Sequence, residues 1–263
     1  MYSYIIIVPY RNREAQLELY IKNVVPLFEK YLKNFKIVVV EQEEGKLFNR
    51  GKILNIGFNE YKDNALCFIT HDVDIQPNEK AILEFYCNKN ENNDVNNGNN
   101  IINSDDSDDS DATGDRERDR ECNNHKIVGI YTSDCNTLGG IIKFNKYIFT
   151  KINGYTNDYW GYGCEDKVLQ NRAELLGTNI HKNIRTNDNK KHDYFAIDDV
   201  GDRIIDSTSD HRTGFEYEYF GKLSYDEKIQ NMLSSGLNNL EYKILERRNL
   251  NDNENIELIK VSV

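Results

Sequence analysis

Two neighbouring stretches organise the chain: Gly139-Gly-Ile-Ile-Lys-Phe144 and Ile152-Asn-Gly-Tyr-Thr-Asn-Asp-Tyr-Trp-Gly-Tyr-Gly-Cys-Glu-Asp166. After the second stretch, pairs of apolar residues recur seven positions apart within 168–176, and Gly177 follows. This spacing predicts an amphipathic helix that ends at the glycine. Glu165 and Asp166 then lie in its first turn, where backbone N–H groups and the helix dipole favour negative charge.

The residues before this helix favour a sugar-binding site over simple helix capping. A Glu-Asp pair on its own is more often a cap. Here Gly161 and Gly163 leave the backbone bare beside Trp160 and Tyr162. Aromatic faces stack on the C–H faces of sugars, and carboxylates accept hydrogen bonds from sugar hydroxyls. The stretch therefore predicts a carbohydrate site.

Length and composition fit one large α/β domain with a full core, or two small ones. The chain has 263 residues, of which 38% are hydrophobic, and a net charge of −11. Nine carboxylates and three arginines within 105–121 contribute −6 of that charge, so −5 remains for the rest. This remainder is ordinary, and lysine and arginine form no basic stripe. We therefore expect neither nucleic acid nor an anionic membrane as a partner.

The cysteines and the N-terminus predict a cytoplasmic protein. Five cysteines are present without CxxC spacing, which favours reduced thiols over a disulfide framework. The opening Met1-Tyr-Ser-Tyr leads directly into an apolar run and does not read as a signal peptide. No apolar run is long enough to span a bilayer.

Strand and helix patterns alternate in the first part of the chain. Apolar, β-branched runs at 4–8, 35–40 and 65–70 predict buried strands. A helix is predicted from about Glu14, which Pro26 kinks or divides, and another within 48–58. Short links between these elements predict a parallel sheet with right-handed crossovers.

Charged residues follow two of these strands. Arg11 and Arg13 come after the first, where open α/β sheets bind ligands; they could hold a phosphate or a base, or merely begin the helix. Asp72-Val73-Asp74 follows the third strand and precedes a predicted Gln-Pro turn. Two acids so spaced can face a divalent cation and the diphosphate that it bridges, although such pairs also cap turns.

The second part of the chain is less regular. Asn, Asp, Ser and Gly dominate 88–124, which predicts a disordered insertion. A strand at 127–131 and a short helix at 145–152 follow, and 178–219 has no clear assignment. Ser224 and Glu227 form a capping box for a helix whose residues Ile229, Met232 and Leu233 are expected to face inward. Segments 240–245 and 256–263 predict a final strand pair.

Several motifs, in their order along the chain, resemble the β-1,4-galactosyltransferases of glycosyltransferase family 7. They are Pro-Tyr-Arg-Asn-Arg at 9–13, Phe-Asn-Arg-Gly-Lys at 48–52, Asp-Val-Asp at 72–74, Gly-Gly at 139–140, Ile-Asn-Gly-Tyr at 152–155, Tyr-Trp-Gly-Tyr-Gly-Cys-Glu-Asp at 159–166 and Ser-Gly-Leu-Asn-Asn-Leu-Glu-Tyr at 235–242. The resemblance implies an α/β GT-A fold, with a single Rossmann-like nucleotide-sugar-binding domain and a mixed central sheet. That domain would cover 1–263, interrupted by the insertion at 88–124.

The resemblance also implies a role for each matching residue. The uridine diphosphate would be held by Pro9, Tyr10, Arg11 and Arg13, and the donor would also be contacted by Phe48, Arg50, Asp72, Gly140 and Tyr162. Glu165 would hold hydroxyls of the donor sugar, and Asp166 would be the general base. Mn²⁺ would be bound by Asp74 and a histidine. His211 is favoured by its distance from Gly236, while His192 is nearer the expected distance after Glu165.

The implied activity is an inverting, metal-dependent transfer of galactose or N-acetylgalactosamine from a UDP-sugar to a hydroxyl of a carbohydrate acceptor. Three positions depart from the family pattern, and the first two of them, Lys167 and Thr137, leave the acceptor and the donor open. Lys167 replaces an acid that binds acceptor N-acetylglucosamine in the vertebrate lactose-type enzymes. Thr137 replaces a bulkier residue, commonly tyrosine, beside the donor sugar's 2-position, and Cys164 stands where a glycine or small residue is common.

Two other functions remain as alternatives. The chain could be a GT-A transferase of another family that uses a different nucleotide sugar, which a donor screen would reveal. It could also be a non-catalytic sugar- or nucleotide-binding module, in which case replacing Asp166 with asparagine would leave its biological activity unchanged.

Overall fold

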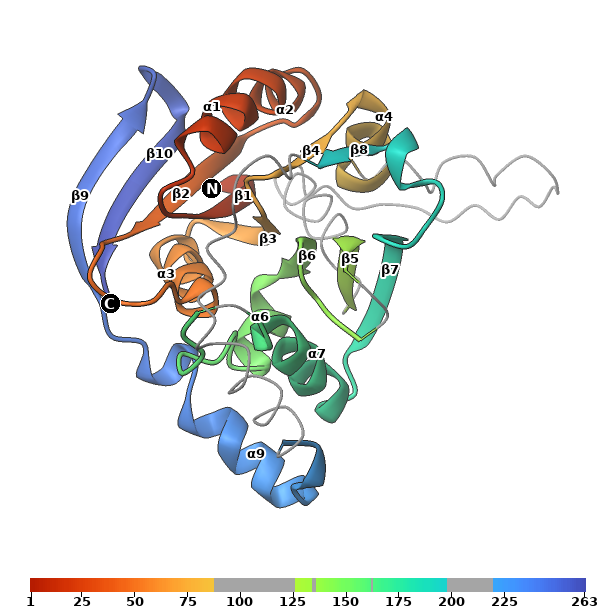
Figure 1. Ribbon diagram of the computed structural model, residues 1–263, viewed down its shortest axis with the longest axis vertical. Helices are drawn as coiled ribbons and strands as arrows, with labels where there is room; N and C mark the ends of the chain where they lie inside the picture. The colour runs from red at the N-terminus through yellow and green to blue at the C-terminus, as the bar shows by residue number, and fades with distance from the viewer. Residues whose placement is uncertain (88–125, 134–135, 162, 198–219) are drawn as a thin grey trace, which may run out of the picture.

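A computed structural model of the chain describes residues 1–87, 126–133, 136–161, 163–197 and 220–263. A mixed eight-stranded sheet is its central layer, with the strand order β7-β5-β6-β3-β1-β2-β10-β9 (Figure 1). A separate pair of short strands, β4 and β8, lies beside it. The mixed central sheet that the resemblance implies is confirmed.

The predicted parallel core of the sheet is also confirmed. Strand β1 (Tyr2–Tyr10) lies between β2 (Phe35–Gln42) and β3 (Ala65–His71) and is parallel to both. On the far side of β2, β10 (Asn253–Ser262) is parallel to it and antiparallel to the edge strand β9 (Lys243–Leu250).

The other half of the sheet reverses direction at one strand. Strand β6 (Ile141–Asn145) is antiparallel to both β3 and β5 (Lys126–Thr132), and β7 (Asn179–Arg185) is parallel to β5. The short pair consists of β4 (Ile75–Pro77) and β8 (Phe195–Ile197). Because β6 runs opposite to β3, the segment before β6 meets the segment after β3 at one edge.

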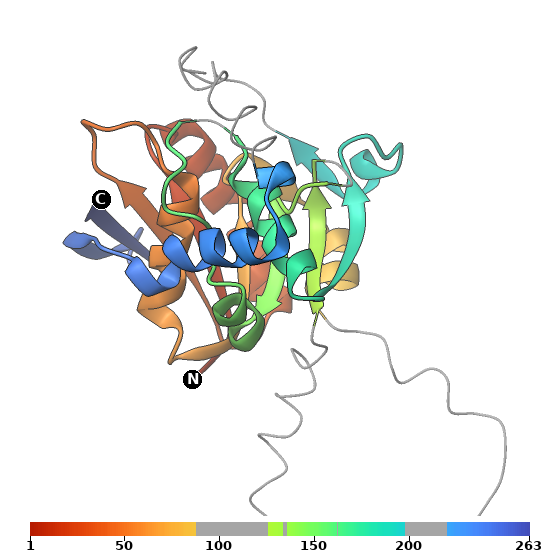
Figure 2. The same ribbon diagram turned by 90° about the horizontal axis from the view of Figure 1, so that it is seen from below.

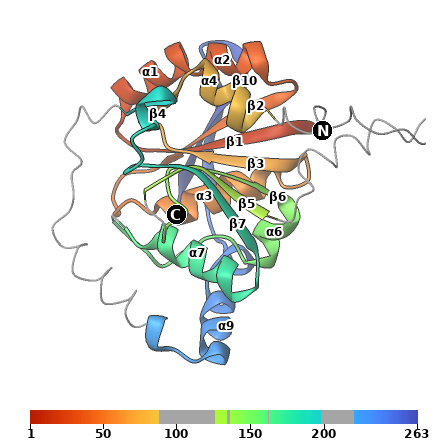
Figure 3. The ribbon, with the colours of Figure 1, turned by 90° about the vertical axis from the view of Figure 1, so that its right-hand side faces the viewer.

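Helices cover both faces of the sheet (Figure 3). One face carries α1 (Glu14–Asn23), α2 (Val25–Tyr31), α4 (Glu79–Ala81) and the π-helical turn η1 (Ile82–Tyr86). The other carries α3 (Arg50–Tyr61), α6 (Lys146–Lys151) and α7 (Glu165–Leu175). Helix α9 (Tyr225–Ser234) lies beyond α7, nearest the viewer in Figure 2. The 3₁₀ turns are η2 (Lys191–Asp193) and η3 (Leu237–Asn239).

This layering explains the continuous apolar strands. In β1, Ile6 and Val8 point into the core that contains α1 and α2, whereas Ile5 and Ile7 point into the core that contains α3 and α7. A strand covered by helices on both faces has no solvated side, so its apolar pattern does not alternate. None of the helices in the described part of the chain has the length and apolar character needed to cross a bilayer.

The structure corrects several local predictions. The Gln-Pro pair predicted as a turn lies in strand β4, because β8 supplies a pairing partner distant in sequence. The segment after Gly177, which has no clear assignment from sequence, forms the polar edge strand β7. Leu233 was predicted to face inward but is 48% exposed, since α9 buries mainly Met232. Of the two predicted effects of Pro26, a kink or a division, the structure shows the division, because α1 ends at Asn23 and α2 begins at Val25.

A buried arginine joins helix α7 to the segment that follows α9. The Arg172 side chain is fully buried, and its guanidinium donates to the carbonyls of Asn153, Gly154 and Ser235 at 3.2, 2.8 and 2.7 Å. Burial lowers the Arg172 pKa to about 10, so the group is still charged at neutral pH. Three charge-assisted bonds to backbone therefore offset the cost of burying it.

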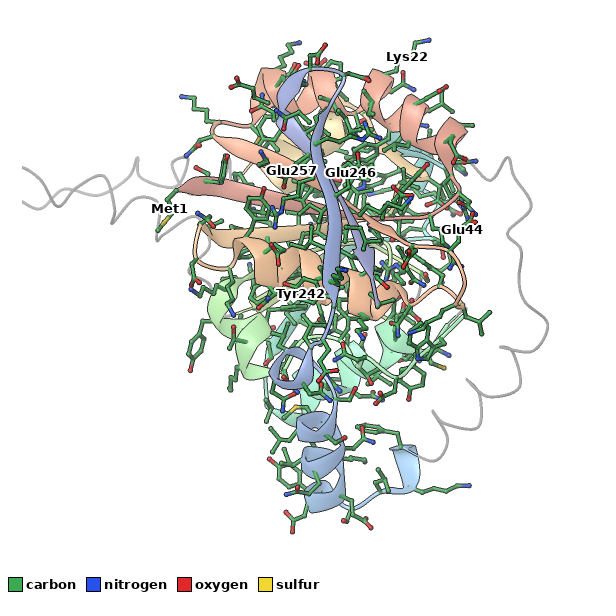
Figure 4. The ribbon with its side chains drawn as sticks, turned by 90° about the vertical axis from the view of Figure 1, so that its left-hand side faces the viewer. Met1, Lys22, Glu44, Tyr242, Glu246 and Glu257 are labelled. Carbon is green, nitrogen blue, oxygen red and sulfur yellow. The ribbon has the colours of Figure 1, made fainter. Side chains whose placement is uncertain are left out.

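The C-terminal hairpin of β9 and β10 is joined to α3 by side chains on its outer surface (Figure 4). The hydroxyl of Tyr242 accepts a hydrogen bond from Asn59 at 2.8 Å and donates one to Glu60. Arg247 on β9 pairs with the same Glu60 and with Glu257 on β10. These contacts hold the edge of the sheet against a central helix.

Helix α7 begins at a strained residue. Cys164 occupies its N-cap position with φ of 71°, in the left-handed region that favours glycine. Gly163 before it also has a positive φ of 97°. Two successive residues of this kind make the sharp turn that brings Glu165 and Asp166 to the start of the helix.

Replacing Arg172 with methionine should strongly destabilise the fold. Methionine keeps much of the length but none of the donors, and each buried carbonyl left without a partner costs about 1–3 kcal/mol. We expect the free energy of unfolding, measured by urea denaturation, to fall by more than about 3 kcal/mol. The control is Arg248→Met, which removes an exposed pair with Glu246 and should cost less than about 1 kcal/mol. Equal losses would contradict this role of Arg172.

Replacing Cys164 with glycine should stabilise the protein. A side chain in the left-handed conformation costs about 1–2 kcal/mol, and glycine removes this cost. Glycine also increases the entropy of the unfolded chain, which cancels about 0.5–1 kcal/mol of the stabilisation. We expect the free energy of unfolding to rise by up to about 1 kcal/mol. Cys164→Ala also removes the thiol but retains Cβ, so it should give no such gain. An equal rise in both variants would show that the backbone is not the cause.

Candidate active site

The predicted site residues meet at one edge of the sheet. Strands β1, β2 and β3 are parallel, so the residues that follow each of them lie at their common carboxyl edge. The pairing of His71 with Ile141 places the start of β6, and the two glycines before it, at that same edge. The backbone N–H of Leu138 donates to the carbonyl of Asp166 at 3.2 Å, which attaches the start of α7 there.

Arg50 is the centre of this assembly. Its Nε and Nη2 donate to Oδ1 of Asp72 at 2.9 and 2.7 Å, and its Nη1 donates to Oδ1 of Asp166 at 2.6 Å. Oε1 of Glu165 is 3.5 Å from the same Nη1. One guanidinium therefore contacts the acid that follows β3 and both acids that begin α7. The Asn49 side chain caps α3 by accepting from the Lys52 N–H, and this fixes the backbone at Arg50.

The three acids differ in their surroundings. Glu165 is 8% exposed, and burial, followed by the charge of Asp166, raises its pKa to about 8; Arg50 acts in the opposite direction. Asp72 and Asp166 are more open to solvent. Glu165 is therefore suited to hold a hydroxyl group, while Asp166 lies at the more accessible position.

A tight turn carries Asp72 and Asp74. The Ile75 N–H donates to the Asp72 carbonyl at 3.3 Å, and the Asp72 N–H donates to the Gly140 carbonyl at 3.3 Å. The side chain of Asp74 lies 3.4 Å from Nη1 of Arg13. The turn thus brings its second carboxylate close to the arginines that follow β1.

The two glycines leave no room for side chains at the site. A Cβ on Gly139 would lie 2.2 Å from Oδ2 of Asp166. Gly140 has φ of +81°, and a Cβ there would lie 2.6 Å from the Tyr131 carbonyl. The bare backbone at 139–140 therefore lets Asp166 and the edge of the sheet approach closely.

Aromatic and basic side chains form a second part of the site, across three loops. Arg11 lies over the ring of Phe48 at 5.2 Å and donates to the Lys46 carbonyl at 2.6 Å. Lys46 in turn lies over the Trp160 ring at 5.7 Å. The Gly161 N–H donates to the Phe48 carbonyl at 2.7 Å. The loops after β1 and β2 are thereby joined to the glycine-rich loop before α7.

The remaining predicted residues are placed only in part. Pro9 and Tyr10 are buried at the end of β1. His192 is exposed on η2, while Tyr162 and His211 lie outside the described residues. Among the residues that are described, no group of three or more histidine, cysteine, aspartate or glutamate side chains is placed to hold a metal ion. The choice between His211 and His192 stays a prediction.

Sequence reasoning did not assign two sets of residues that shape the site. Gln42 accepts from the Asn49 N–H at 2.8 Å and donates to the Leu47 carbonyl at 2.8 Å, which fixes the loop before Arg50. His71 is fully buried between the strand and the acidic turn. The signal for His71 was present, since a histidine at the end of an otherwise apolar strand is unusual, but its partner Tyr86 is 15 residues away.

Comparison with known proteins identifies relatives by sequence. Family models described as the N-terminal region of glycosyl transferase group 7 and the N-terminal domain of galactosyltransferase match residues 1–88 and 127–196. Human β-1,4-galactosyltransferase 4 is 34% identical over 67% of this chain and 44% of its own length. Bovine β-1,4-galactosyltransferase 1 is 28% identical over 92% of this chain and 50% of its own. The chain thus spans half or less of these relatives.

The fold has a counterpart among solved structures. Drosophila β-1,4-galactosyltransferase 7, described in complex with manganese, UDP-Gal and xylobiose, matches with a TM-score of 0.66 and 18% identity. The match covers 100% of this chain and 94% of the Drosophila chain. At this identity the likeness establishes the GT-A fold alone. The sequence matches show that the chain belongs to the β-1,4-galactosyltransferase family, glycosyltransferase family 7.

Proposed function

We propose that the protein is an inverting, metal-dependent glycosyltransferase that moves galactose or N-acetylgalactosamine from a UDP-sugar to a carbohydrate hydroxyl. The observation that carries this proposal is the bridge from Arg50 to Asp72 and Asp166, made at the carboxyl edge of the sheet in a chain of this family. One guanidinium thereby binds both Asp72, which is proposed to contact the donor sugar, and Asp166, the proposed base.

The residues then divide the reaction between them. Asp166 accepts the proton of the acceptor hydroxyl as that oxygen attacks the anomeric carbon. The bond from the anomeric carbon to the diphosphate breaks on the opposite face, and its electron pair leaves with UDP, so the anomeric configuration inverts. A positioned carboxylate base typically contributes about 10²–10⁴-fold to the rate. Glu165, more deeply buried, is proposed to hold hydroxyls of the donor sugar, and Arg11, Arg13 and Phe48 the uridine diphosphate.

The described residues fit a manganese site in part. Asp74 supplies a hard carboxylate oxygen, the type of ligand that Mn²⁺ favours, at a point where the cationic Arg13 already lies within 3.4 Å. The structure of the Drosophila relative, described with manganese and UDP-Gal, supports the same pairing of ion and donor. A bound Mn²⁺ would neutralise charge on the leaving diphosphate. The second protein ligand is proposed to be His211, with His192 as the alternative.

The donor and the acceptor are the finer part of the proposal. Thr137 is buried beside the glycine pair, with its carbonyl bonded to Lys182 at 2.6 Å. Its side chain is smaller than the tyrosine that is common at this position, which supports N-acetylgalactosamine as well as galactose as the donor sugar. The xylobiose in the Drosophila structure supports a sugar acceptor of some kind. We further propose that 1–263 forms one domain; a cytoplasmic location stays a prediction.

The first test is a screen of UDP-sugars with and without Mn²⁺. We expect the wild-type protein to transfer galactose or N-acetylgalactosamine only with the metal. Asp74→Ala should lose at least about 100-fold in rate, because it removes a direct ligand. The control is Asp188→Ala, which removes an acid that is not among those that Arg50 contacts, and it should keep wild-type activity. Preference for UDP-glucose, or metal-independent turnover, would refute the proposal.

A second test concerns the choice of donor. In Thr137→Tyr the larger side chain should exclude the N-acetyl group, so the ratio of kcat/KM for UDP-galactose to that for UDP-N-acetylgalactosamine should rise at least about tenfold. Thr137→Val keeps the volume of the side chain and should leave the ratio unchanged. If both variants give the wild-type ratio, Thr137 does not select the donor.

A further inference from the structure

We propose that His71 and Tyr86 are positioning residues that fix the acidic turn at 72–75 from beneath, and so set the geometry of the metal- and donor-binding carboxylates. The inference rests on the function proposed above, because it concerns the same Asp72 and Asp74. Neither His71 nor Tyr86 is in a position to touch the substrate, since both are fully buried.

The carbonyl oxygen of Asp72 is the point at which the turn is held. It accepts the Ile75 N–H at 3.3 Å, which closes the turn, and it lies 3.0 Å from Nδ1 of His71. On the other side of the same residue, the Asp72 N–H donates to the Gly140 carbonyl. The peptide groups on either side of Asp72 are therefore fixed by contacts with the His71 ring, with Ile75 of the turn and with Gly140 just before β6.

These contacts determine where the imidazole carries its proton. A carbonyl oxygen only accepts hydrogen bonds, so Nδ1 of His71 must be the donor. Burial lowers the His71 pKa to about 4, which leaves Nε2 as an acceptor at neutral pH. Nε2 lies 3.0 Å from the Tyr86 hydroxyl, which is then the donor of that bond. Tyr86 thus selects the tautomer in which His71 can hold the turn.

Tyr86 is itself held in place. It ends the π-helical turn η1, and its carbonyl accepts from Nζ of Lys143 at 3.2 Å. Lys143 lies on β6, paired with Ile69 of β3, and its Nζ lies 5.1 Å from the centre of the Tyr4 ring. Buried contacts therefore run from strand β6 through Tyr86 and His71 to the acidic turn. His71 acts on the backbone of the turn and not on the Asp74 carboxylate itself; where a direct partner of a metal ligand is lost, metal affinity falls by about 10–100-fold, so we expect an effect at the lower end of that range.

The test compares four variants. His71→Leu removes the donor, while His71→Asn places an amide N–H where Nδ1 stood and should restore the bond to Asp72. Tyr86→Phe removes the hydroxyl that selects the tautomer. Tyr20→Phe is the matched control, because Tyr20 is equally buried and its ring lies 5.0 Å from the His71 ring, but its hydroxyl makes no hydrogen bond within the described residues.

The first measurement is the affinity for Mn²⁺ in the presence of UDP. Binding is monitored through the electron paramagnetic resonance signal of the free ion. We expect about a tenfold loss in His71→Leu, a smaller loss in Tyr86→Phe, and affinities within about threefold of wild type in His71→Asn and Tyr20→Phe. Wild-type affinity in both His71→Leu and Tyr86→Phe would overturn the proposal. So would an equal loss in His71→Asn and His71→Leu, since the amide would then have restored nothing.

The second measurement does not depend on metal or on activity. Long-range ¹H–¹⁵N spectra of the histidine rings should show His71 of the wild-type protein with its proton on Nδ1. Tyr86→Phe should alter that ring's signals, and Tyr20→Phe should leave the tautomer unchanged. A proton on Nε2 would overturn the proposal even if His71→Leu failed to fold. A protein with the expected spectra and Mn²⁺ affinities that transferred no sugar would instead refute the proposed function and leave this inference intact.

Discussion

The site depends on the positive charge of one side chain, the guanidinium of Arg50. Arg50 at the start of α3 is bonded to Asp72 after β3 and to Asp166 at the start of α7, two acids that are 94 positions apart in the sequence (166 − 72). Three carboxylates so close together would repel one another, and burial would disfavour their charged forms. The guanidinium offsets part of both effects, because its planar fork donates to Asp72 and Asp166 at once, but the pKa of the more buried Glu165 still rises to about 8. The capping of α3 by Asn49 and the contact of Gln42 with Asn49 can be understood as means of holding this one side chain in place.

The sheet brings together the loops whose acids Arg50 binds. Parallel β1, β2 and β3 end together, and antiparallel β6 begins where they end, so four loops meet at one edge. Loops that extend from a fixed layer of strands can carry polar and strained residues without loss of the core. Cys164, Gly140 and Gly163 are all in such loops and all have positive φ. Other loops also contain residues with positive φ, among them Asn34 before β2 and Asn153 after α6, so this backbone conformation is not limited to the site.

Much of the fold could be predicted because its signals are local. The buried strands at 4–8, 35–40 and 65–70, the division at Pro26 and the capping box at Ser224 each depend on a few adjacent residues. Strands β4 and β7 could not be predicted, since their pairing partners are distant and their side chains are polar or few. The motifs indicated which residues belong to the site. They did not reveal that Arg50 joins the two acidic pairs, or that Tyr86 lies behind His71, because such contacts leave no periodic pattern.

The strand order has a consequence for synthesis. Strand β10 is parallel to β2 and lies between it and β9, although residues 35–42 and 253–262 are far apart in the sequence. Until residues 253–262 have left the ribosome, the edge of β2 with its apolar residues Ile37, Val39 and Val40 has no partner strand. An exposed apolar edge of this kind favours pairing with other chains. The interval between the synthesis of β2 and that of β10 is therefore the period in which this edge is open to such pairing.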